Sequence, residues 1–161
     1  MAGLSKSVRQ QVWARAKFRC EYCQSSMRLT GMPLVIDHIQ PQILGGSDAL
    51  VNLAAACYRC NEFKGGRTSG VDQETGETVA LYNPRSQAWS EHFAWDETGI
   101  MVVGLTPVGQ VSVMVLRLNN EDVVAARGIW VQWGWHPPQD GSSITPQTDR
   151  GATNKPPPTT P

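Results

Sequence analysis

The sequence has no long apolar run and no excess of charge of one sign. Its 161 residues contain 14 Lys and Arg against 14 Asp and Glu, and charged residues make up only 17% of the chain. No apolar stretch approaches the ~20 residues that span a bilayer. Segment 1–6 also lacks the apolar region of a signal peptide. With 40% hydrophobic residues, the composition predicts a soluble globular protein in the cytoplasm, built as one small domain with an extension and not associated with membranes.

The neutral total hides an uneven distribution of charge along the chain. Residues 1–30 carry six bases and one acid, residues 31–70 three of each, and residues 71–161 five bases and ten acids. The basic first segment is compatible with contact to phosphates, although a charge cluster is more often a solvated face. If the partner is a nucleic acid, we expect its backbone to lie along residues 1–30 and 61–67, away from the acidic remainder.

The four cysteines form two Cys-x-x-Cys pairs, Cys20 with Cys23 and Cys57 with Cys60. Two intervening residues let both sulfurs of a pair face one tetrahedral ion, and a closed four-cysteine site is typical of structural zinc. The gap between the pairs is long enough for a complete supersecondary unit. Two separate redox pairs, or four buried apolar cysteines, are the alternatives. A four-thiolate site has no open position for a substrate, so the cluster indicates stability and not catalysis.

Local patterns predict several elements before residue 70. Ser7 and Gln10 fit a capping box at the start of an amphipathic helix that ends before Cys20. The β-prone run 34–36 predicts a strand that continues through residues 37–39 and stops at a proline. The alanine-rich run 53–57 favours a helix by propensity alone. Residues 59–64 favour a helix that a glycine pair terminates.

The remaining residues are less distinctive. Residues 78–82 favour a strand, and residues 121–133 favour a helix with acids at its N-terminus. The segment after Thr106-Pro107 begins as a helix, but its β-branched run leaves helix and strand both open. Five of the six tryptophans lie in this half, where core packing is favoured over a base-stacking surface. The tail from 139 is predicted to be disordered by its Pro- and Thr-rich composition.

Three further side chains of this half are expected to be structural. His92 and His136 lie outside any recognisable motif, and we interpret both as structural histidines. Arg85 follows an Asn-Pro pair, and an intramolecular salt bridge is favoured for it over contact with a phosphate.

A set of polar residues lies between and just after the cysteine pairs. Together with those pairs, the order Ile36-Asp37-His38-Ile39-x-Pro41, Gly45-Gly46, Asn52-Leu53 and Cys60-Asn61-x-x-Lys64-Gly65 resembles the HNH endonuclease family over residues 20–66. Four elements in the correct order make this resemblance specific. Residues 78–138 are similar to the extension of small standalone HNH proteins of bacteria, cyanobacteria especially.

The resemblance implies an α+β fold with a ββα-metal (His-Me finger) core stapled by a four-cysteine zinc site. The implied domains are a nuclease core over residues 1–70, a mixed α/β extension over residues 71–138 that packs on the core, and the tail over residues 139–161. The resemblance also implies a strand near residues 53–56, although the alanine run there has helical propensity. The cysteines at 20, 23, 57 and 60 match the structural zinc ligands.

The resemblance further implies roles for individual residues. His38 matches the general base, Asp37 and Asn61 match the ligands of a catalytic divalent ion, and Asn52 matches the middle asparagine that braces the loop. The third motif position is often His in the family and is Asn here, which supplies an oxygen ligand. Direct participation of Asn52 in catalysis is as well supported as bracing. Lys64, and Arg67 after it, match candidate phosphate contacts, with a solvated lysine as the alternative.

These residue types suit phosphodiester hydrolysis. A neutral imidazole with a pKa near ~6.5 accepts a proton from water at cellular pH. Carboxylate and amide oxygens are the ligands that Mg²⁺ prefers. Asp37 and His38 are adjacent, however, and successive side chains of a regular strand face opposite ways, so a shared site requires the pleat to break at the strand end.

The sequence therefore predicts a metal-dependent endonuclease whose substrate is DNA, most simply double-stranded DNA. Its expected cofactors are a structural zinc ion and a catalytic magnesium or other divalent ion. The alternative is a non-catalytic, zinc-dependent nucleic-acid-binding or scaffolding module. A symmetric double-strand cut would require a homodimer or sequential nicking, and the sequence favours neither.

Overall fold

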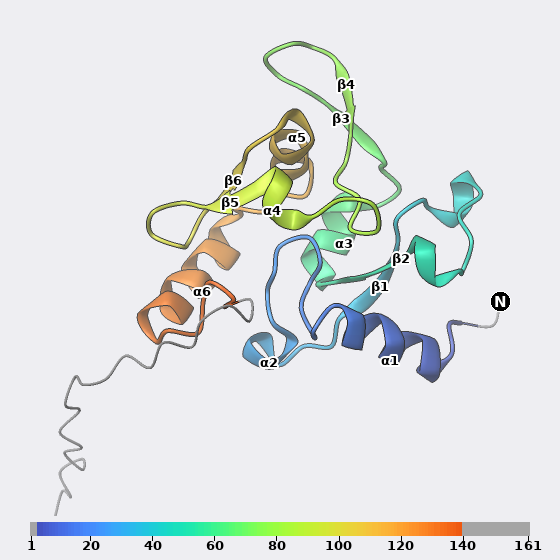
Figure 1. Ribbon diagram of the computed structural model, residues 1–161, viewed down its shortest axis with the longest axis horizontal. Helices are drawn as coiled ribbons and strands as arrows, with labels where there is room; N and C mark the ends of the chain where they lie inside the picture. The colour runs from blue at the N-terminus through green and yellow to red at the C-terminus, as the bar shows by residue number, and fades with distance from the viewer. Residues whose placement is uncertain (1–2, 140–161) are drawn as a thin grey trace, which may run out of the picture.

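The computed structural model describes residues 3–139 of the chain (Figure 1). In chain order its elements are α1 (Lys6–Arg15), α2 (Met27–Thr30), β1 (Val35–His38), η1 (Gln42–Leu44), η2 (Leu50–Asn52), β2 (Leu53–Ala56), α3 (Tyr58–Lys64), β3 (Ser69–Val71), β4 (Thr78–Ala80), α4 (Trp89–His92), β5 (Phe93–Trp95), β6 (Val102–Gly104), α5 (Pro107–Val115) and α6 (Glu121–Gln132). All but the first residue of the predicted tail lies outside the described residues.

The centre of the N-terminal part is a ββα unit. Strands β1 and β2 pair antiparallel, with Val35 opposite Ala56 and His38 opposite Leu53. Helix α3 follows β2 after one residue and packs against both strands. The predicted ββα-metal fold class is confirmed by this unit together with the clustered cysteines.

Strand β2 shows why propensity alone was a poor guide to the alanine run. All four of its side chains, Leu53 and the three alanines 54–56, are completely buried. Alanine has the highest helix propensity, but hydrogen bonding to β1 and burial between α1 and α3 determine the backbone here. The strand implied by the family resemblance is confirmed, and the helix predicted by propensity is wrong.

Helix α1 begins two residues earlier than the capping-box pattern indicates. Ser5, not Ser7, is the N-cap, because its extended backbone lets its Oγ accept a hydrogen bond from Val8 N at 3.2 Å. Ser7 instead lies inside the first turn, where its Oγ accepts from Gln11 Nε2. The helix buries Val12 completely and ends at Arg15, before the first cysteine as expected.

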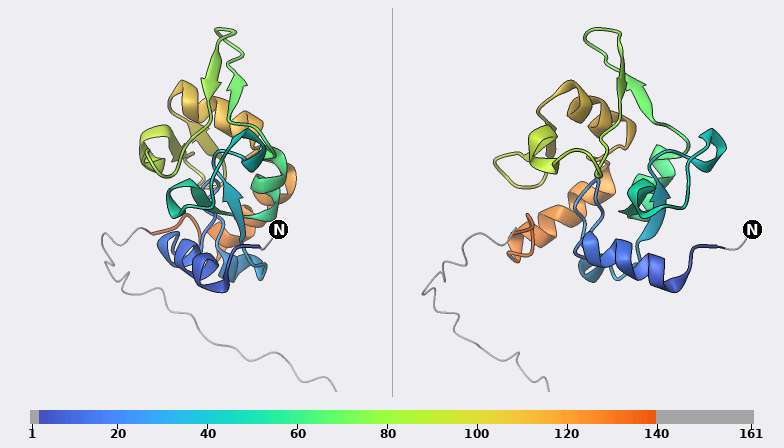
Figure 2. Two further views of the ribbon diagram at one scale, coloured as in Figure 1. Left: turned by 90° about the vertical axis from the view of Figure 1, so that its right-hand side faces the viewer. Right: turned by 45° about the vertical axis from the view of Figure 1, so that its right-hand side comes forward.

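The C-terminal part is built from two hairpins and three helices. Hairpin β3–β4 projects away from the body in every view (Figures 1 and 2). Helix α5 packs against β3, β4 and β6, so it holds the base of this hairpin against the second one. The segment after Thr106 is a helix, since Thr106 Oγ1 caps Gly109 N at 3.1 Å and proline occupies the first turn.

The C-terminal part packs directly on the first cysteine pair. Trp89 Nε1 donates to Tyr22 O at 2.9 Å, and the Arg85 guanidinium pairs with the Glu21 carboxylate, as the sequence predicted for Arg85. Arg127 is completely buried and donates to the carbonyl of Leu118 within this part and to the carbonyl of Cys23 at 3.5 Å. These contacts tie residues 82–136 to the turn at residues 20–24.

Most of the tryptophans of this half pack as expected. Trp89 stacks on Trp95 at 5.4 Å between ring centroids, and Trp95 meets His136 edge-on at 4.3 Å. Trp130 is 9% exposed. Trp133 and Trp135 differ, because they are 66% and 56% exposed and stack on one another at the end of α6.

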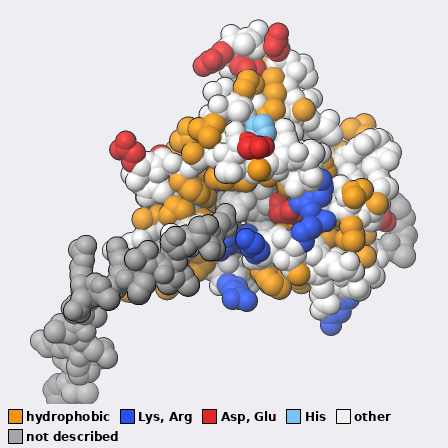
Figure 3. Space-filling view, in the orientation of Figure 1, with side chains coloured by type: hydrophobic (Ala, Val, Ile, Leu, Met, Phe, Trp, Pro, Cys, Tyr) orange, Lys and Arg blue, Asp and Glu red, His pale blue; other side chains and the backbone are white. Residues whose placement is uncertain are grey.

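Charge is segregated over the surface. On the face shown in Figure 3, the Lys and Arg side chains gather in the lower half, over the N-terminal elements. Acidic side chains mark the tip of the β3–β4 hairpin, the loop that contains Asp72, Glu74 and Glu77. In the part of the chain that the structure describes, no helix has the length and apolar character needed to cross a bilayer.

The burial of His136 predicts a pH-dependent stability. Burial, together with the nearby Arg127 charge, lowers the pKa of His136 to about 4 from its ordinary value near 6.5. Between pH 6.5 and 4, His136 therefore binds a proton in the unfolded chain but not in the folded one. The stability that the folded protein gains from a neutral His136 is complete above pH 6.5 and is lost as the pH falls toward 4. Between pH 7 and 5, the free energy of unfolding should fall by about 1–2 kcal/mol more in the wild type than in His136→Asn.

Urea unfolding of the two proteins at pH 7, 6 and 5 measures this difference directly. Parallel pH dependences in wild type and variant would show that His136 does not titrate between the folded and unfolded states.

Candidate active site and metal centre

The four cysteines gather at one buried point. Cys20 and Cys23 lie in the turn after α1, and Cys57 and Cys60 lie at the start of α3. Their sulfurs all lie within 4.8 Å of one another, and Cys23 Sγ is 3.7 Å from Cys57 Sγ. All four are free thiols and not disulfides. The cysteine pairs are thus arranged to hold a metal ion.

Backbone geometry prepares each pair for the ion. Cys23 N donates to Cys20 Sγ at 3.5 Å, and Cys60 N donates to Cys57 Sγ at 3.4 Å, so each pair has the same N–H···S turn. The first turn is closed by Gln24, whose φ of 62° is left-handed. The second turn uses Cys57 as the N-cap of α3. Within each turn, the backbone N–H of the second cysteine thus points at the sulfur of the first.

The cluster fits zinc by distance and by charge. A tetrahedral ion with Zn–S bonds of ~2.3 Å has sulfur–sulfur edges of about 3.8 Å, close to the Cys23–Cys57 separation. Burial raises the pKa of the Cys20 thiol, whereas hydrogen bonds from the other thiols lower the pKa of Cys23. Four adjacent sulfurs, three of them on buried cysteines, cannot all ionise next to one another unless a cation compensates them. The donor set is thus consistent with a structural zinc ion.

Asp37, in the middle of the pairing between β1 and β2, is 3% exposed. Tyr22, between the two cysteines of the first pair, donates its hydroxyl to Asp37 Oδ2 at 2.5 Å. Lys64 Nζ donates to Asp37 Oδ1 at 3.0 Å and to His38 O at 2.9 Å. Burial, followed by the Asp37 charge, raises the pKa of Tyr22, so this hydroxyl remains a donor. Asp37 is therefore held in a buried network that joins the first cysteine pair, β1 and α3.

Lys64 is placed differently from the expected phosphate contact. It is 2% exposed, and its ammonium faces the interior of the protein, where Asp37 neutralises it. It is not a solvated lysine either. Arg67 is exposed and donates to Phe63 O at 3.3 Å, so it retains access to a ligand at the surface.

His38 ends β1, and its side chain faces away from Asp37. His38 Nε2 lies 2.7 Å from Asp48 Oδ1, and the imidazole is 20% exposed. The two neighbours thus follow the ordinary strand alternation, with Asp37 inward and His38 toward the β1–β2 loop. Pairing is regular within β1, so a site shared by Asp37 and His38 has to form at the end of the strand, where His38 is the last residue.

Asn52 holds the β1–β2 loop closed. Its Oδ1 accepts from Gln40 N at 2.8 Å, and its Nδ2 donates to Gln40 O at 3.0 Å and to Ser47 O at 2.9 Å. The loop passes so close to itself that a Cβ on Gly46 would lie 1.7 Å from Gln40 O, which only glycine avoids. All polar atoms of the Asn52 side chain are committed to the backbone. This geometry favours the bracing role.

Asn61 lies one helical turn before Lys64 on α3 and is half-buried. Among residues 3–139, its side chain takes part in no hydrogen bond with another protein group. The amide is therefore available to a ligand on the side of α3 that faces β1.

A catalytic divalent ion has fewer preformed ligands than the zinc site. Within the described residues, the four cysteines are the only group of three or more His, Cys, Asp or Glu side chains placed to share an ion. Asp37 and Asn61 offer the hard oxygens that magnesium prefers. Each Asp37 oxygen already accepts one hydrogen bond and has a second lone pair. The chemistry of the donors fits the ion, which would share Asp37 with Lys64.

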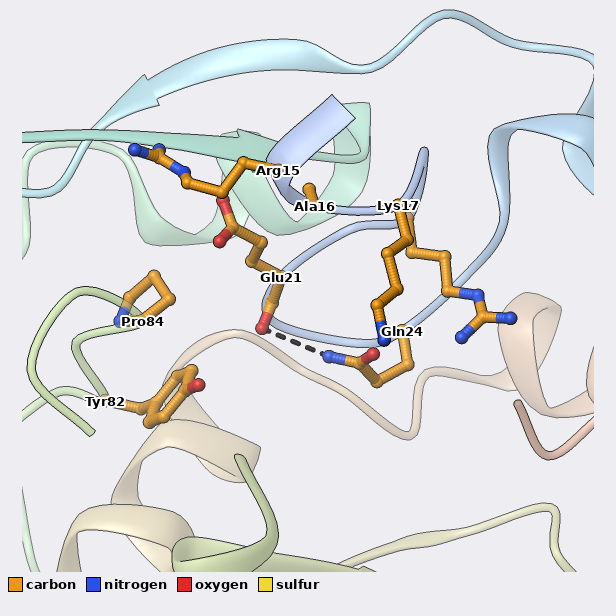
Figure 4. Close-up of a pocket in the computed structure, with 8 residues that line it drawn as sticks. Arg15, Ala16, Lys17, Glu21, Gln24, Tyr82 and Pro84 are labelled. Carbon is orange, nitrogen blue, oxygen red and sulfur yellow. Dashed lines mark hydrogen bonds between the residues drawn. The ribbon is translucent and has the colours of Figure 1, made fainter. Parts of the chain in front are cut away.

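Two hollows border these residues. One, of about 480 Å³, lies beside Lys64 between the β1–β2 loop and residues 80–87. The other, of about 190 Å³, lies between α1, the first cysteine turn and residues 82–84 (Figure 4). In Figure 4, Glu21 lies between Arg15 and Lys17, and Tyr82 and Pro84 lie at the lower left of the view. The Arg15 guanidinium donates to Leu50 O and Leu53 O, so part of the basic segment serves the fold.

Two residues of this region have no role in the sequence-based interpretation. Asp48 follows the glycine pair of the loop, and Tyr22 lies inside the first Cys-x-x-Cys. No spacing rule connects Asp48 with His38, because loop closure by Asn52 brings them together. Tyr22 is a different case, because a residue between two metal ligands must lie close to the ion. Its position inside the first Cys-x-x-Cys could therefore have identified it from the sequence.

Comparison with known proteins agrees with the site. Residues 20–67 match a family model described as HNH endonuclease. The chain is 27% identical to the Septu protein PtuB of Bacillus mycoides (strain KBAB4), in a match that covers 68% of this chain and 45% of that protein. The chain thus spans less than half the length of this relative. No solved structure matches the chain.

Loss of one cysteine should abolish metal binding and cooperative folding together. Cys57→Ser is expected to lower bound zinc from one ion per chain to none and to remove the cooperative unfolding transition, because folding and metal binding are coupled in small thiolate sites. Metal analysis and thermal unfolding measure the two effects. Tyr58→Phe, a neighbouring change at an exposed side chain, should leave both unchanged. Cooperative unfolding at the wild-type midpoint in zinc-free protein would show that the cluster is not a structural metal site.

The buried Lys64–Asp37 pair should matter for stability. Lys64→Met leaves an uncompensated buried carboxylate and is expected to lower the free energy of unfolding by about 3–5 kcal/mol. Arg67→Met, at the exposed end of the same segment, should change it by less than about 0.5 kcal/mol. Adding Asp37→Asn to Lys64→Met should recover part of the loss. Denaturant unfolding tests all three, and a loss below 1 kcal/mol for Lys64→Met would contradict the buried pairing.

Proposed function

From the premise that residues 20–67 form an HNH-family domain, we propose that this protein is a metal-dependent DNA endonuclease that hydrolyses phosphodiester bonds. The observation that carries the proposal is the position of His38. Its imidazole is partly exposed at the end of β1, on a ββα unit that the clustered cysteines connect to the turn after α1. His38 is the only histidine of residues 20–67, and its ring nitrogens are the kind of group that can accept a proton from water.

The imidazole of His38 would act as the general base. A neutral ring accepts a proton from the attacking water at cellular pH, and such proton transfer contributes about 10²–10⁴-fold to the rate. The strand pairing with Leu53 and the bond from Lys64 to His38 O fix the backbone at this residue. The base is therefore positioned by the same elements that form the core.

Asp37 and Asn61 are the proposed ligands of the divalent ion. When bound, the ion supplies positive charge that polarises the phosphate and stabilises the departing oxygen. Lys64 keeps the Asp37 carboxylate fixed beside α3, while Tyr22 connects it to the zinc-binding turn. Asn61 lies on the same helix, so both proposed ligands are attached to rigid elements.

The proposed substrate is double-stranded DNA, approached from the basic N-terminal side. The segregation of charge supports this direction, because the acidic hairpin tip and the basic side chains occupy different parts of the surface (Figure 3). Arg67 and exposed bases of the first segment would contact phosphates. The free thiols of the cysteine cluster support a reducing compartment, for which we propose the cytoplasm.

A non-catalytic, zinc-dependent nucleic-acid-binding module is the second candidate. The Lys64–Asp37 pair favours it, since an ammonium already neutralises the carboxylate that would bind the catalytic ion. This candidate predicts salt-sensitive DNA retention and no cleavage with any divalent ion.

Digestion of supercoiled plasmid with a panel of divalent ions tests the proposal. Cleavage is expected with Mg²⁺ or Mn²⁺, and His38→Ala should reduce its rate by at least about 100-fold because the base is lost. His92→Asn, a histidine change in the C-terminal part, should retain the activity. Zinc content and thermal midpoint serve as controls for folding.

Equal cleavage by wild type and His38→Ala would exclude His38 as the base. DNA retention without cleavage under every ion would favour the binding module instead.

A further inference from the structure

The β1–β2 loop places a carboxylate against the proposed base. We infer that Asp48 is a positioning residue that holds the His38 imidazole through Nε2 and leaves Nδ1 as the proton-accepting atom. This inference rests on the proposed function and specifies how its base is presented. The distance between His38 Nε2 and Asp48 Oδ1, 2.7 Å, is that of a short charge-assisted hydrogen bond.

The direction of this hydrogen bond follows from the chemistry of the two groups. An ionised carboxylate only accepts hydrogen bonds, so the proton between the two atoms belongs to Nε2. In the neutral ring the other nitrogen, Nδ1, then carries the lone pair. After Nδ1 has taken a proton, the ring is positive and the Asp48 charge stabilises it. The aspartate of a serine-protease triad fixes the tautomer of its histidine in the same way.

The loop holds Asp48 at this position from two sides. Gln42 Nε2 donates to Asp48 Oδ1 at 2.9 Å, so the carboxylate is anchored within the loop and is not freely rotating. Asn52 Nδ2 holds the preceding residue through Ser47 O, and its Oδ1 holds Gln40. The bracing asparagine therefore acts on His38 indirectly, since it fixes the backbone at Ser47, next to Asp48, and at Gln40, two residues after His38.

The exposure of the pair sets the expected size of the effect. The Asp48 side chain is 54% exposed and that of His38 is 20% exposed, so water partly replaces a lost partner. The loss on removing Asp48 should therefore be smaller than the loss on removing the base itself.

The first test is kinetic. Asp48→Ala should lower kcat for plasmid nicking by about 10-fold, less than the 10²–10⁴ attributed to a general base, with KM within twofold of wild type. Asp48→Glu should recover part of kcat, because a carboxylate again reaches Nε2. Glu62→Ala removes one exposed carboxylate from α3 and controls for the change in charge near DNA; it should leave kcat unchanged.

The second test does not depend on activity. In ¹⁵N-labelled protein without DNA, with the ring neutral, the His38 nitrogen shifts should show a protonated Nε2 and an unprotonated Nδ1. In Asp48→Ala the Nε2 proton should lose its protection from exchange, whereas Glu62→Ala should match wild type. Thermal midpoints confirm that each variant is folded.

The outcomes separate this inference from the proposed function. A protonated Nδ1 in wild type, or a kcat unchanged or raised in Asp48→Ala, would overturn the positioning role, and a raised kcat would indicate that Asp48 restrains the base. If wild type cleaves no DNA, the proposed function fails, and the nitrogen shifts still decide whether Asp48 sets the tautomer.

Discussion

The convergence of four thiols on one point is the constraint on which the rest of the structure depends. A two-stranded sheet of four-residue strands is marginally stable by itself. The cysteine pairs join the turn after α1 to the start of α3, so they fix the helix on the sheet from its N-terminal end. Everything proposed for catalysis lies on elements that this junction holds together.

A chain of polar contacts extends from that junction to the proposed site. Tyr22 lies between two metal ligands and holds Asp37, Asp37 holds Lys64, and Lys64 holds the carbonyl of His38. Each of these groups is buried and satisfied, which is the condition under which a polar network in a core is stabilising. The structural metal site and the base are thus two ends of one network. The C-terminal part covers the turn at residues 20–24 through Trp89 and Arg85. This cover explains how so small a nuclease core can contain buried charged groups.

The sequence predicted the cysteine cluster, the strand carrying Asp37 and His38, and the helices at residues 59–64 and 121–133, because each has a local signal. Strand β2 required the family resemblance, since its alanines favour helix and only burial makes them a strand. The inward direction of Lys64 was not predictable from spacing, which places it near Asn61 but does not say which face of α3 meets β1. Asp48 and His38 are ten residues apart in the sequence, and their contact depends on the path of the loop between them. No local sequence pattern encodes that path. The roles of His38, Asn52, Asn61 and Arg67 stay predictions.

Two of the three buried alanines of β2, Ala54 and Ala56, lie on the same face of the sheet as Asp37, because Ala54 is the partner of Asp37 across the strands. Side chains this small leave the helix backbone near the strand, and that short separation is what allows Lys64 to reach the carboxylate of Asp37 across the interface. A larger side chain at either position would overpack the layer on this face of the sheet. It would also move Asp37 on β1 away from Asn61 on α3, the two proposed oxygen ligands. The small side chains of β2 therefore set the distance between these ligands.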